Sequence, residues 1–247
     1  MRLYGDLAWV WSLFTDQETY EDEAQNLVEI ALDALSRDEQ AAISFLELGA
    51  GGGYLASALP QHWRLTLVDI SNEMLIESQK INPKARHLQG DMCHLNLNEK
   101  FDVILVHDAV MYLKNLEAAQ LMMQSIQQHL APKGVAILIP DAIKESFYER
   151  SFLGGASGIH NDQMVDAQLT EWHWDPNPED DQVMVEFSLL LRENGTVQSV
   201  HESHPMLVLS LAQWMTLFNE VGLYTEFSMV PWMGGGDFFL LKNQPAS

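Results

Sequence analysis

The sequence predicts an α/β protein with a doubly wound, mostly parallel sheet. Three observations support this fold class. Strands and helices alternate from residue 43 to residue 139, which is typical of βαβ units. The first strand ends in a glycine-rich turn at 49–53 that opens a helix. After Pro140 the alternation stops, and the chain continues into a predicted antiparallel hairpin.

The size and charge of the chain limit its partners. Its 247 residues, 47% of them hydrophobic, suit a single domain with an insertion. The formal net charge is −22, with 13 Lys and Arg against 35 Asp and Glu. This charge opposes binding to nucleic acids, whose phosphates need cations, and to anionic membrane surfaces. We therefore expect a small-molecule partner and leave a homodimer open.

The number of cysteines and the pattern of the N-terminus both bear on the cellular compartment of the protein. Cys93 is the only cysteine, so no intrachain disulfide can form, and a reducing compartment is the natural reading. The N-terminus has no signal-peptide pattern, and no apolar run reaches the length of a membrane span. We expect a cytoplasmic protein.

The first 40 residues are expected to form a lid and a helix. The aromatic residues of the first part are Tyr4, Trp9, Trp11 and Phe14. Their spacing allows either a lid over a ligand site or a docked arm. Between residues 20 and 35, apolar residues recur at helical spacing, with acidic residues on the other face.

The elements of the alternating part follow from their patterns. Apolar runs predict strands at 43–48, 65–68, 86–89, 101–106 and 135–139. The fourth is nearly all apolar, as expected for a strand buried on both faces. Helices are predicted at 54–59, 72–80 and 116–130, and Ser71 is a suitable N-cap for the second of these.

The segment 141–206 is interpreted as an inserted cap. Residues 141–182 are expected to be irregular, because they contain Gly154, Gly155, Gly158 and the Trp172–Pro176 aromatic cluster. Strands at 183–191 and 196–204 flank Asn194-Gly195, a hairpin turn signal. A helix at 211–221 and strands at 224–230 and 237–241 follow, and glycines 234–236 separate the two strands.

The glycine turn and Asp69 point to a ligand. Ligands of doubly wound sheets bind at the carboxyl ends of the strands, near the first turn. Glycines there let a ligand approach backbone N–H groups. Asp69 ends the second strand, where its carboxylate can accept ribose hydroxyls. These features serve NAD and S-adenosylmethionine alike, and Gly51-x-Gly53-x-x-Ala56 keeps the dinucleotide alternative open.

Glu47 inside the first motif and Gly90-Asp91-Met92 after the third strand favour the methyl donor. With them, the chain resembles the class I S-adenosylmethionine-dependent methyltransferases over essentially its whole length. Glu47-x-Gly49-x-Gly51-x-Gly53 resembles the family's first motif, Asp69 its second and Gly90-Asp91-Met92 its third. The resemblance implies a Rossmann-like sheet of seven strands, the last of them antiparallel, with S-adenosylhomocysteine as the product.

The resemblance also implies site residues. Glu47 would support the glycine loop, Asp69 would bind the ribose, and Asp91 would accept from the adenine amino group. His107 and Asp108 would face the methyl group. The full expected set of donor-binding residues is Tyr4, Trp11, Glu47, Gly49, Ala50, Gly51, Gly53, Asp69, Ile70, Met74, Asp91, Met92 and His107.

Within that family, the chain is most similar to small-molecule methyltransferases of mostly unassigned substrate, and its hairpin layout is similar to that of the sugar N,N-dimethyltransferases. The residues that carry this likeness are 4–8, 106–112, 140–147, 171–176 and the region of His204. The segment 152–160 departs from the pattern, which leaves the role of His160 open. The aromatic residues Tyr4, Trp11, Trp172 and Trp174 are expected to cover the site.

Histidines are the candidate general bases, because their pKa lies near neutrality. His107 and His204 are the predicted catalytic residues, while a packing role remains open for both. Asp108 could orient His107, cap the next turn or bind the donor, and His173 is expected to pack within the cap. No residue spacing indicates a metal.

Two other functions stay open at this point. One is a non-catalytic S-adenosylmethionine-binding module that contacts a partner through the acidic helix near 16–39. The other is an NAD(P)-dependent oxidoreductase. An RNA methyltransferase is disfavoured by the net charge and by the absence of a Lys/Arg cluster.

Overall fold

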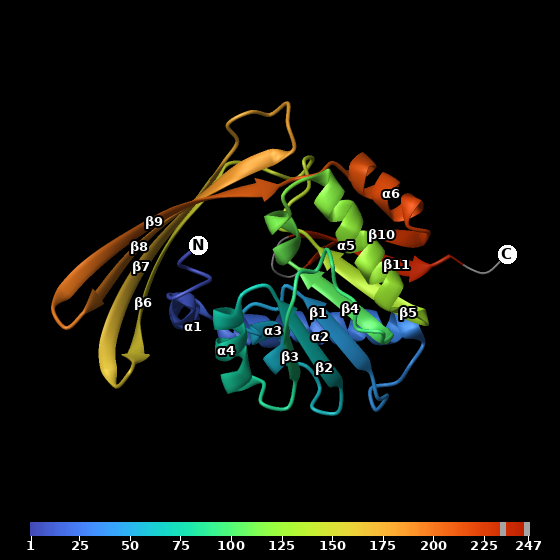
Figure 1. Cartoon of the computed structure of the whole chain (residues 1–247), viewed down its shortest axis with the longest axis horizontal. Helices are drawn as coiled ribbons and strands as arrows, with labels where there is room; N and C mark the ends of the chain where they lie inside the picture. Colours follow the sequence, from blue (N-terminus) through green and yellow to red (C-terminus); the bar gives the residue numbers. More distant parts are fainter. Residues whose placement is uncertain (233–235, 245–247) are drawn as a thin grey trace.

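The computed structural model describes residues 1–232 and 236–244. It contains a seven-stranded sheet and a four-stranded sheet (Figure 1). The seven-stranded sheet has the order β10-β11-β5-β4-β1-β2-β3, and only β11 runs antiparallel to its neighbours. Its strands are β1 (Ser44–Leu48), β2 (Arg64–Asp69), β3 (Arg86–Gln89), β4 (Phe101–His107), β5 (Leu130–Ile139), β10 (Leu223–Trp232) and β11 (Gly236–Asn243). The predicted fold class is confirmed.

Helices cover both faces of this sheet (Figure 1). Side chains of α2 and α3 share one core with Phe45, Val103 and Leu105. Those of α5 and α6 share another with Leu46, Ile104 and Val106. The apolar run of β4 thus serves two cores, as expected of a strand buried on both faces. The helices are α1 (Trp11–Phe14), α2 (Gln17–Leu35), α3 (Tyr54–Ser57), α4 (Asn72–Ile81), α5 (Leu116–His129) and α6 (Leu211–Glu220), with short 3-10 turns η1 (Ala8–Val10) and η2 (Ala109–Tyr112).

Helices α2, α4, α5 and α6 begin at residues whose side chains accept backbone N–H groups. Ser71 Oγ accepts the N–H of Met74 and starts α4, which confirms the predicted cap. Asp16 caps α2, and Asn115 caps α5. Ser210 and Gln213 form a capping box on α6.

The inserted segment is more regular than predicted. The hairpin is present as β8 (Gln182–Glu193) and β9 (Thr196–Leu207). The expectation of an irregular stretch at 141–182 was wrong, because β6 (Arg150–His160) and β7 (Gln163–Trp174) complete a four-stranded antiparallel sheet. In β7, Val165, Ala167, Leu169 and His173 are buried and alternate with more exposed residues, which is the period-2 pattern of a half-buried strand.

The glycines of β6 have a packing role. A Cβ atom on Gly158 would lie 2.5 Å from Leu13 Cδ2, and one on Gly154 would lie 3.6 Å from Phe14. The residues that suggested a loop therefore let α1 pack closely against the strand.

The N-terminal segment lies between the two sheets (Figure 1). Ser71 Oγ donates to the carbonyl of Tyr4, which fastens the segment to the end of β2. Glu202 of β9 accepts the backbone N–H groups of Arg2 and Leu3. Near the far end of β6, Trp9 stacks on His160, with ring centroids 3.6 Å apart. His160 thus packs against the N-terminal segment.

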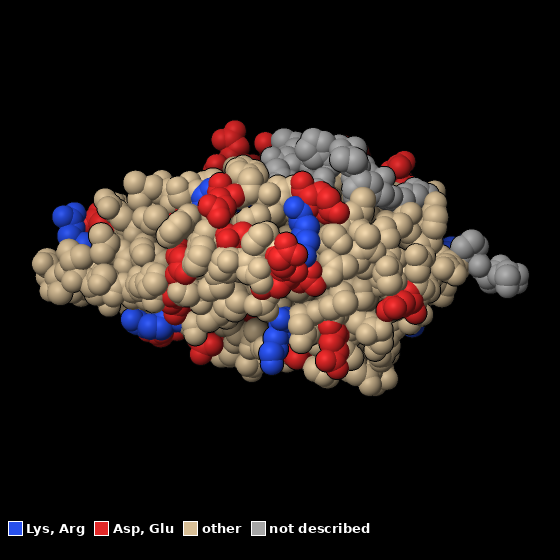
Figure 2. All heavy atoms as spheres, turned by 90° about the horizontal axis from the view of Figure 1, so that it is seen from above, with Lys and Arg blue, Asp and Glu red and all other residues tan. Residues whose placement is uncertain are grey.

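Acidic side chains are spread over the face shown in Figure 2, with few Lys and Arg among them. The described part of the chain contains no helix that is both long and apolar enough to cross a membrane. Of glycines 234–236, Gly234 and Gly235 lie outside the described residues.

Candidate active site

A cavity of about 700 Å³ opens at the carboxyl ends of β1, β2 and β4. We call it the first cavity. This is the position at which doubly wound sheets bind ligands. The predicted donor-binding residues that line it are Tyr4, Trp11, Glu47, Gly49, Ala50, Gly51, Asp69, Ile70, Met74, Asp91, Met92 and His107.

Gly53 is the one member of that set that does not line the first cavity. Its φ of +69° and its place at the start of α3 suit a glycine. A Cβ atom there would lie 2.2 Å from Ser78 Oγ, and Asn82 Nδ2 donates to the Gly53 carbonyl over 2.8 Å. Gly53 therefore joins α3 to α4, while Gly52 faces the cavity.

The glycine turn is held open by its neighbours. Gly49 has a φ of +76°, and a Cβ atom on it would lie 2.1 Å from Ala109 Cβ. The Gly51 N–H donates to Asp69 Oδ2 over 2.7 Å, and the Ser71 N–H donates to Asp69 Oδ1 over 2.8 Å. Burial raises the pKa of Asp69 despite these bonds. Each carboxylate oxygen can accept a further bond from a ligand.

Glu47 is a buried carboxyl at the base of the glycine turn. Only 4% of its surface is exposed, and its Oε2 atom has no hydrogen-bond partner among the described residues. Burial, followed by the charges of Asp69 and Asp108, raises the pKa of Glu47 to about 8. A buried carboxyl that lacks a partner is costly, so a cationic ligand group beside it would be favoured.

Asp91 both caps a turn and lines the first cavity. Its Oδ1 accepts the Cys93 N–H over 2.8 Å, and its Oδ2 lies 2.9 Å from His94 Nδ1. Burial opposes ionisation, but these contacts outweigh it and hold the pKa of Asp91 below its usual value. Ile70 lies at the same end of the cavity, with its side chain exposed.

A second cavity of about 450 Å³ lies beyond His107 and Asp108, which line both cavities. We call it the second cavity. Its other carboxyl groups come from Asp16 and Glu23 at the start of α2 and from Asp141 after β5. Arg150 of β6 supplies its one cation, and its aromatic walls are Phe14, Tyr20, Tyr148 and Phe152.

Asp108 stands between the two cavities in a strained backbone conformation. Its φ is +56° and its ψ is −41°, outside the left-handed helical region. The Asp108 N–H donates to the Ile139 carbonyl of β5 over 2.9 Å, which holds this conformation. Strain of this kind is retained where the surroundings enforce it, often at functional sites.

The charges around Asp108 are mostly negative. More than half of the Asp108 side-chain surface is accessible to solvent. This accessible surface lines the two cavities, so it lies inside the protein and not on its outer surface. Burial accordingly raises the pKa of Asp108 to about 6. His107 Nε2 lies 3.3 Å from Asp108 Oδ1. Burial lowers the pKa of His107, so this imidazole is neutral at pH 7.

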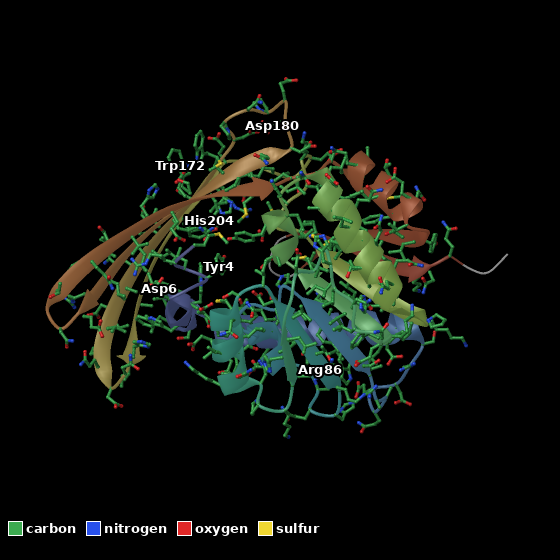
Figure 3. All side chains as sticks on the ribbon, viewed as in Figure 1. Tyr4, Asp6, Arg86, Trp172, Asp180 and His204 are labelled. Atoms are coloured by element: carbon green, nitrogen blue, oxygen red, sulfur yellow. The ribbon has the colours of Figure 1, made fainter. Side chains whose placement is uncertain are left out.

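His204 lines neither cavity. It is 2% exposed, and its Nδ1 lies 3.3 Å from the Tyr112 hydroxyl. Tyr112 lines the first cavity and shares a 2.7 Å hydrogen bond with Tyr4. The catalytic role of His204 stays a prediction, and Tyr112 separates His204 from the first cavity. Figure 3 shows Tyr4 and His204 close together between the two sheets.

The aromatic cover was predicted only in part. Tyr4 stacks on Trp11, and both line the first cavity. Trp172 and Trp174 stack on each other, and Trp172 is 49% exposed. Because they alternate with buried His173, they project from the opposite face of β7, and neither of them lines the first or the second cavity. His173 packs inside against Phe152 and contacts Glu171.

Among the wall residues that were not predicted as site residues are Tyr112, Glu23 and Arg150, although Tyr112 belongs to the segment 106–112 that carries the family likeness. Glu23 belongs to a helix whose acidic side resembles a solvated face, yet it is buried. Tyr112 lies five residues after His107, in the turn that follows β4. Within residues 1–232 and 236–244, no group of three or more His, Cys, Asp or Glu residues has an arrangement that could hold a metal ion.

Comparisons with known proteins define the class. Residues 46–138 match the family model of a methyltransferase domain. The dTDP-3-amino-3,4,6-trideoxy-alpha-D-glucopyranose N,N-dimethyltransferase of Streptomyces venezuelae is 26% identical over 210 residues, which cover 84% of this chain and 85% of that relative.

Solved structures show the same fold. The sugar N-methyltransferase KedS8 from Streptoalloteichus sp. ATCC 53650 has a TM-score of 0.76 and 15% identity, covering 97% of this chain and 92% of its own. CalS10 from Micromonospora echinaspora is an amino pentose methyltransferase whose structure was solved with S-adenosylmethionine bound. It has a TM-score of 0.72 and 18% identity, and the match covers 91% of this chain and 92% of the CalS10 chain. These two structures share the fold of this chain.

Residues 46–138 match the methyltransferase domain, so the protein is an S-adenosylmethionine-dependent methyltransferase and S-adenosylmethionine is its methyl donor. The first cavity fits that donor. The unpaired Oε2 of buried Glu47 suits the ammonium of the methionine moiety, and Gly49 and Gly51 line the cavity beside it. Asp69 has acceptor capacity for the ribose. These relatives give no support to the nicotinamide alternative or to a module without turnover.

Proposed function

We propose that this enzyme methylates the nitrogen of an amine on a small polar acceptor such as an amino sugar. One observation carries the proposal: the second, acidic cavity meets the donor cavity at His107 and Asp108. The names of the relatives agree with it, since they describe an amino-sugar N,N-dimethyltransferase, an amino pentose methyltransferase and a sugar N-methyltransferase.

The two cavities divide the reaction between them. Bound in the first cavity, the donor supplies a methyl group on a sulfonium. Methyl transfer is an in-line displacement, so the protein acts mainly by holding the acceptor nitrogen opposite that group. The second cavity, at about 450 Å³, is large enough for a sugar-sized molecule. Its carboxyl groups attract a cationic amine.

His107 is proposed to position Asp108 at the junction, since its Nε2 lies 3.3 Å from the Asp108 carboxyl. His204 is proposed to act through Tyr112, whose hydroxyl it contacts. Tyr4 and Trp11 would keep water from the donor, because they cover the first cavity. Nothing in this arrangement calls for a metal ion.

The test is a comparison of matched sugars. Purified enzyme and S-adenosylmethionine are incubated with amino sugars that carry the amine at carbon 2, 3 or 4, and with the corresponding hydroxyl sugars, free and linked to a nucleotide. Mass spectrometry should find one or two added methyl groups on nitrogen in an amino sugar. Methylation of the hydroxyl sugars at equal or higher rates would contradict the proposal.

Four coarser expectations accompany this proposal. The net charge of −22 disfavours a nucleic-acid or membrane partner. The presence of a single cysteine favours a cytoplasmic location. The chain is treated as one domain, with a lid at 1–40 and a cap at 141–206, because residues of both sheets share a core. A homodimer remains a prediction, which light scattering would check.

A further inference from the structure

Asp108 and Asp141 form a carboxyl pair at the meeting point of the two cavities. Both side chains line the second cavity, and they are close enough to share a hydrogen bond when one of them is protonated. Burial, followed by the charge and hydrogen bond of Asp108, raises the pKa of Asp141 well above its usual value. Two carboxyls in such contact do not both ionise. Their mutual contact lowers the pKa of Asp108 and raises the pKa of Asp141, which makes Asp141 the hydrogen-bond donor of the pair and Asp108 the acceptor.

Glu23 is an independent sign of a cationic ligand. It comes from α2, on the other side of the second cavity, and is 94% buried, with 6% of its surface exposed. Its Oε2 atom has no hydrogen-bond partner among the described residues. A buried carboxyl that no protein group satisfies is unfavourable unless a ligand supplies the missing donor.

The histidines are less suitable proton acceptors than Asp108. The pKa of His107 is lowered by burial, and its Nε2 is already directed to Asp108. His204 is separated from the cavities by Tyr112 and contacts Glu202 with its other nitrogen. Asp108 lines both cavities, so it alone of the carboxyl groups can contact an acceptor nitrogen that faces the donor.

We propose that Asp108 takes the proton from the acceptor's ammonium group, that Asp141 positions Asp108 for this step, and that Glu23 binds the ammonium. The proposal rests on the N-methylation proposed above. An N–H proton of the ammonium passes to the Asp108 carboxylate, which leaves a neutral amine with a free lone pair. The lone pair forms the new N–C bond while the methyl group's bond to sulfur breaks and its electron pair stays on sulfur. The protonated Asp108 returns its proton to solvent when the product leaves.

Several other charged and titratable groups face this pair. They come from β1, β4, α2, β6, β7, the N-terminal segment and η2. These groups are Glu47, His107, Tyr20, Glu23, Arg150, Glu171, Tyr4 and Tyr112. Arg150 is the cation among them and favours the charged form of Asp108. The ionisation of Asp108 therefore depends on all of these groups. For this reason the test compares the pH profiles of variants with that of the wild type.

The first experiment measures binding with S-adenosylhomocysteine present, so that no turnover occurs. Calorimetry compares 3-amino-3-deoxyglucose with glucose. The wild type should prefer the amine by at least tenfold, and Glu23→Gln should lose that preference while its affinity for S-adenosylhomocysteine stays within twofold. Equal affinity of the wild type for the two sugars would overturn the ammonium site.

The second experiment follows kcat against pH with the best amine acceptor of the panel. The wild-type kcat should fall as the pH drops below about 6, where Asp108 gains a proton. Asp108→Asn should lower kcat about 100-fold or more and remove this dependence. Asn suits the positive φ at this position, and Asp108→Gly serves in its place if the first variant is unfolded.

Asp141 gives the control for positioning. Asp141→Ala removes the hydrogen bond to Asp108 and should move the acidic fall of kcat to higher pH, while Asp141→Asn keeps a donor and should restore it. Asp166→Asn, an exposed carboxyl of β7 bound to Arg192, makes the same chemical change elsewhere and should alter nothing. An Asp108→Asn enzyme that N-methylates with the wild-type rate and pH profile would overturn this inference alone. A wild type that methylates only hydroxyls would overturn the proposed function.

Discussion

The Tyr4 hydroxyl lies 2.7 Å from the Tyr112 hydroxyl, and this hydrogen bond joins the N-terminal lid to the turn that follows β4. Tyr112 in turn contacts His204 of the four-stranded sheet. One pair of tyrosines therefore connects three segments that are distant in the sequence and that surround the first cavity.

Removing either hydroxyl should loosen the lid over the donor. Tyr4→Phe and Tyr112→Phe are each expected to weaken S-adenosylhomocysteine binding by about 0.5–1.5 kcal/mol, the net contribution of one hydrogen bond. The double variant should be no weaker than the worse single variant, because both changes remove the same bond. Calorimetry on the three proteins checks this, and additive losses would show that the two hydroxyls act separately.

Asp69→Ala should weaken donor binding by about 1.5–3 kcal/mol, the range for hydrogen bonds to a charged group. Asp69 also accepts the Gly51 N–H and so holds the glycine turn. Asp69→Asn keeps one acceptor oxygen and should therefore lose less donor affinity than Asp69→Ala. The measurement is the dissociation constant of S-adenosylmethionine, and an unchanged affinity in Asp69→Ala would remove this residue from the ribose site.

The raised pKa of Glu47 should make the free energy of unfolding of the ligand-free protein depend on pH. Its pKa is about 8 when folded, above that of an ordinary Glu. Between these two values the folded state holds a proton that the unfolded state has lost, so the free energy of unfolding falls as pH rises, by at most about 1.4 kcal/mol per pH unit. Glu47→Gln should lack this fall.

Urea denaturation of both proteins at pH 5 and pH 8 tests this prediction. The Gln variant should gain stability relative to the wild type at pH 8, yet bind S-adenosylmethionine more weakly there, because it cannot pair with the ligand's ammonium. Parallel pH dependence in the two proteins would show that Glu47 does not titrate in this range.

Much of the fold could be predicted from local patterns. The βαβ alternation and the glycine turn are determined by residues close in sequence, so the parallel strands and the Ser71 cap were predicted correctly, and all the predicted donor-binding residues except Gly53 line one cavity. Strands β6 and β7 were missed because Gly154, Gly155 and Gly158 are loop signals unless the helix packed against them is known.

The second cavity could not be predicted, since its walls come from α2, β6 and the ends of β4 and β5. Nothing in the sequence separates buried Glu23 from the exposed acids beside it. The face of a strand that meets the core also depends on its register, and for this reason Trp172 and Trp174 were assigned to the wrong side.

The glycines of β6 offer a matched pair of changes that tests how the lid is seated. In Gly158→Ala the new Cβ would lie 2.5 Å from Leu13 Cδ2, so α1 must shift. In Gly155→Ala on the same strand, the closest atom is 3.9 Å away. Because α1 leads back to Trp11 and Tyr4 over the first cavity, Gly158→Ala should weaken S-adenosylhomocysteine binding severalfold. Gly155→Ala should bind it as the wild type does, and equal affinities in both variants would show that α1 does not position the lid.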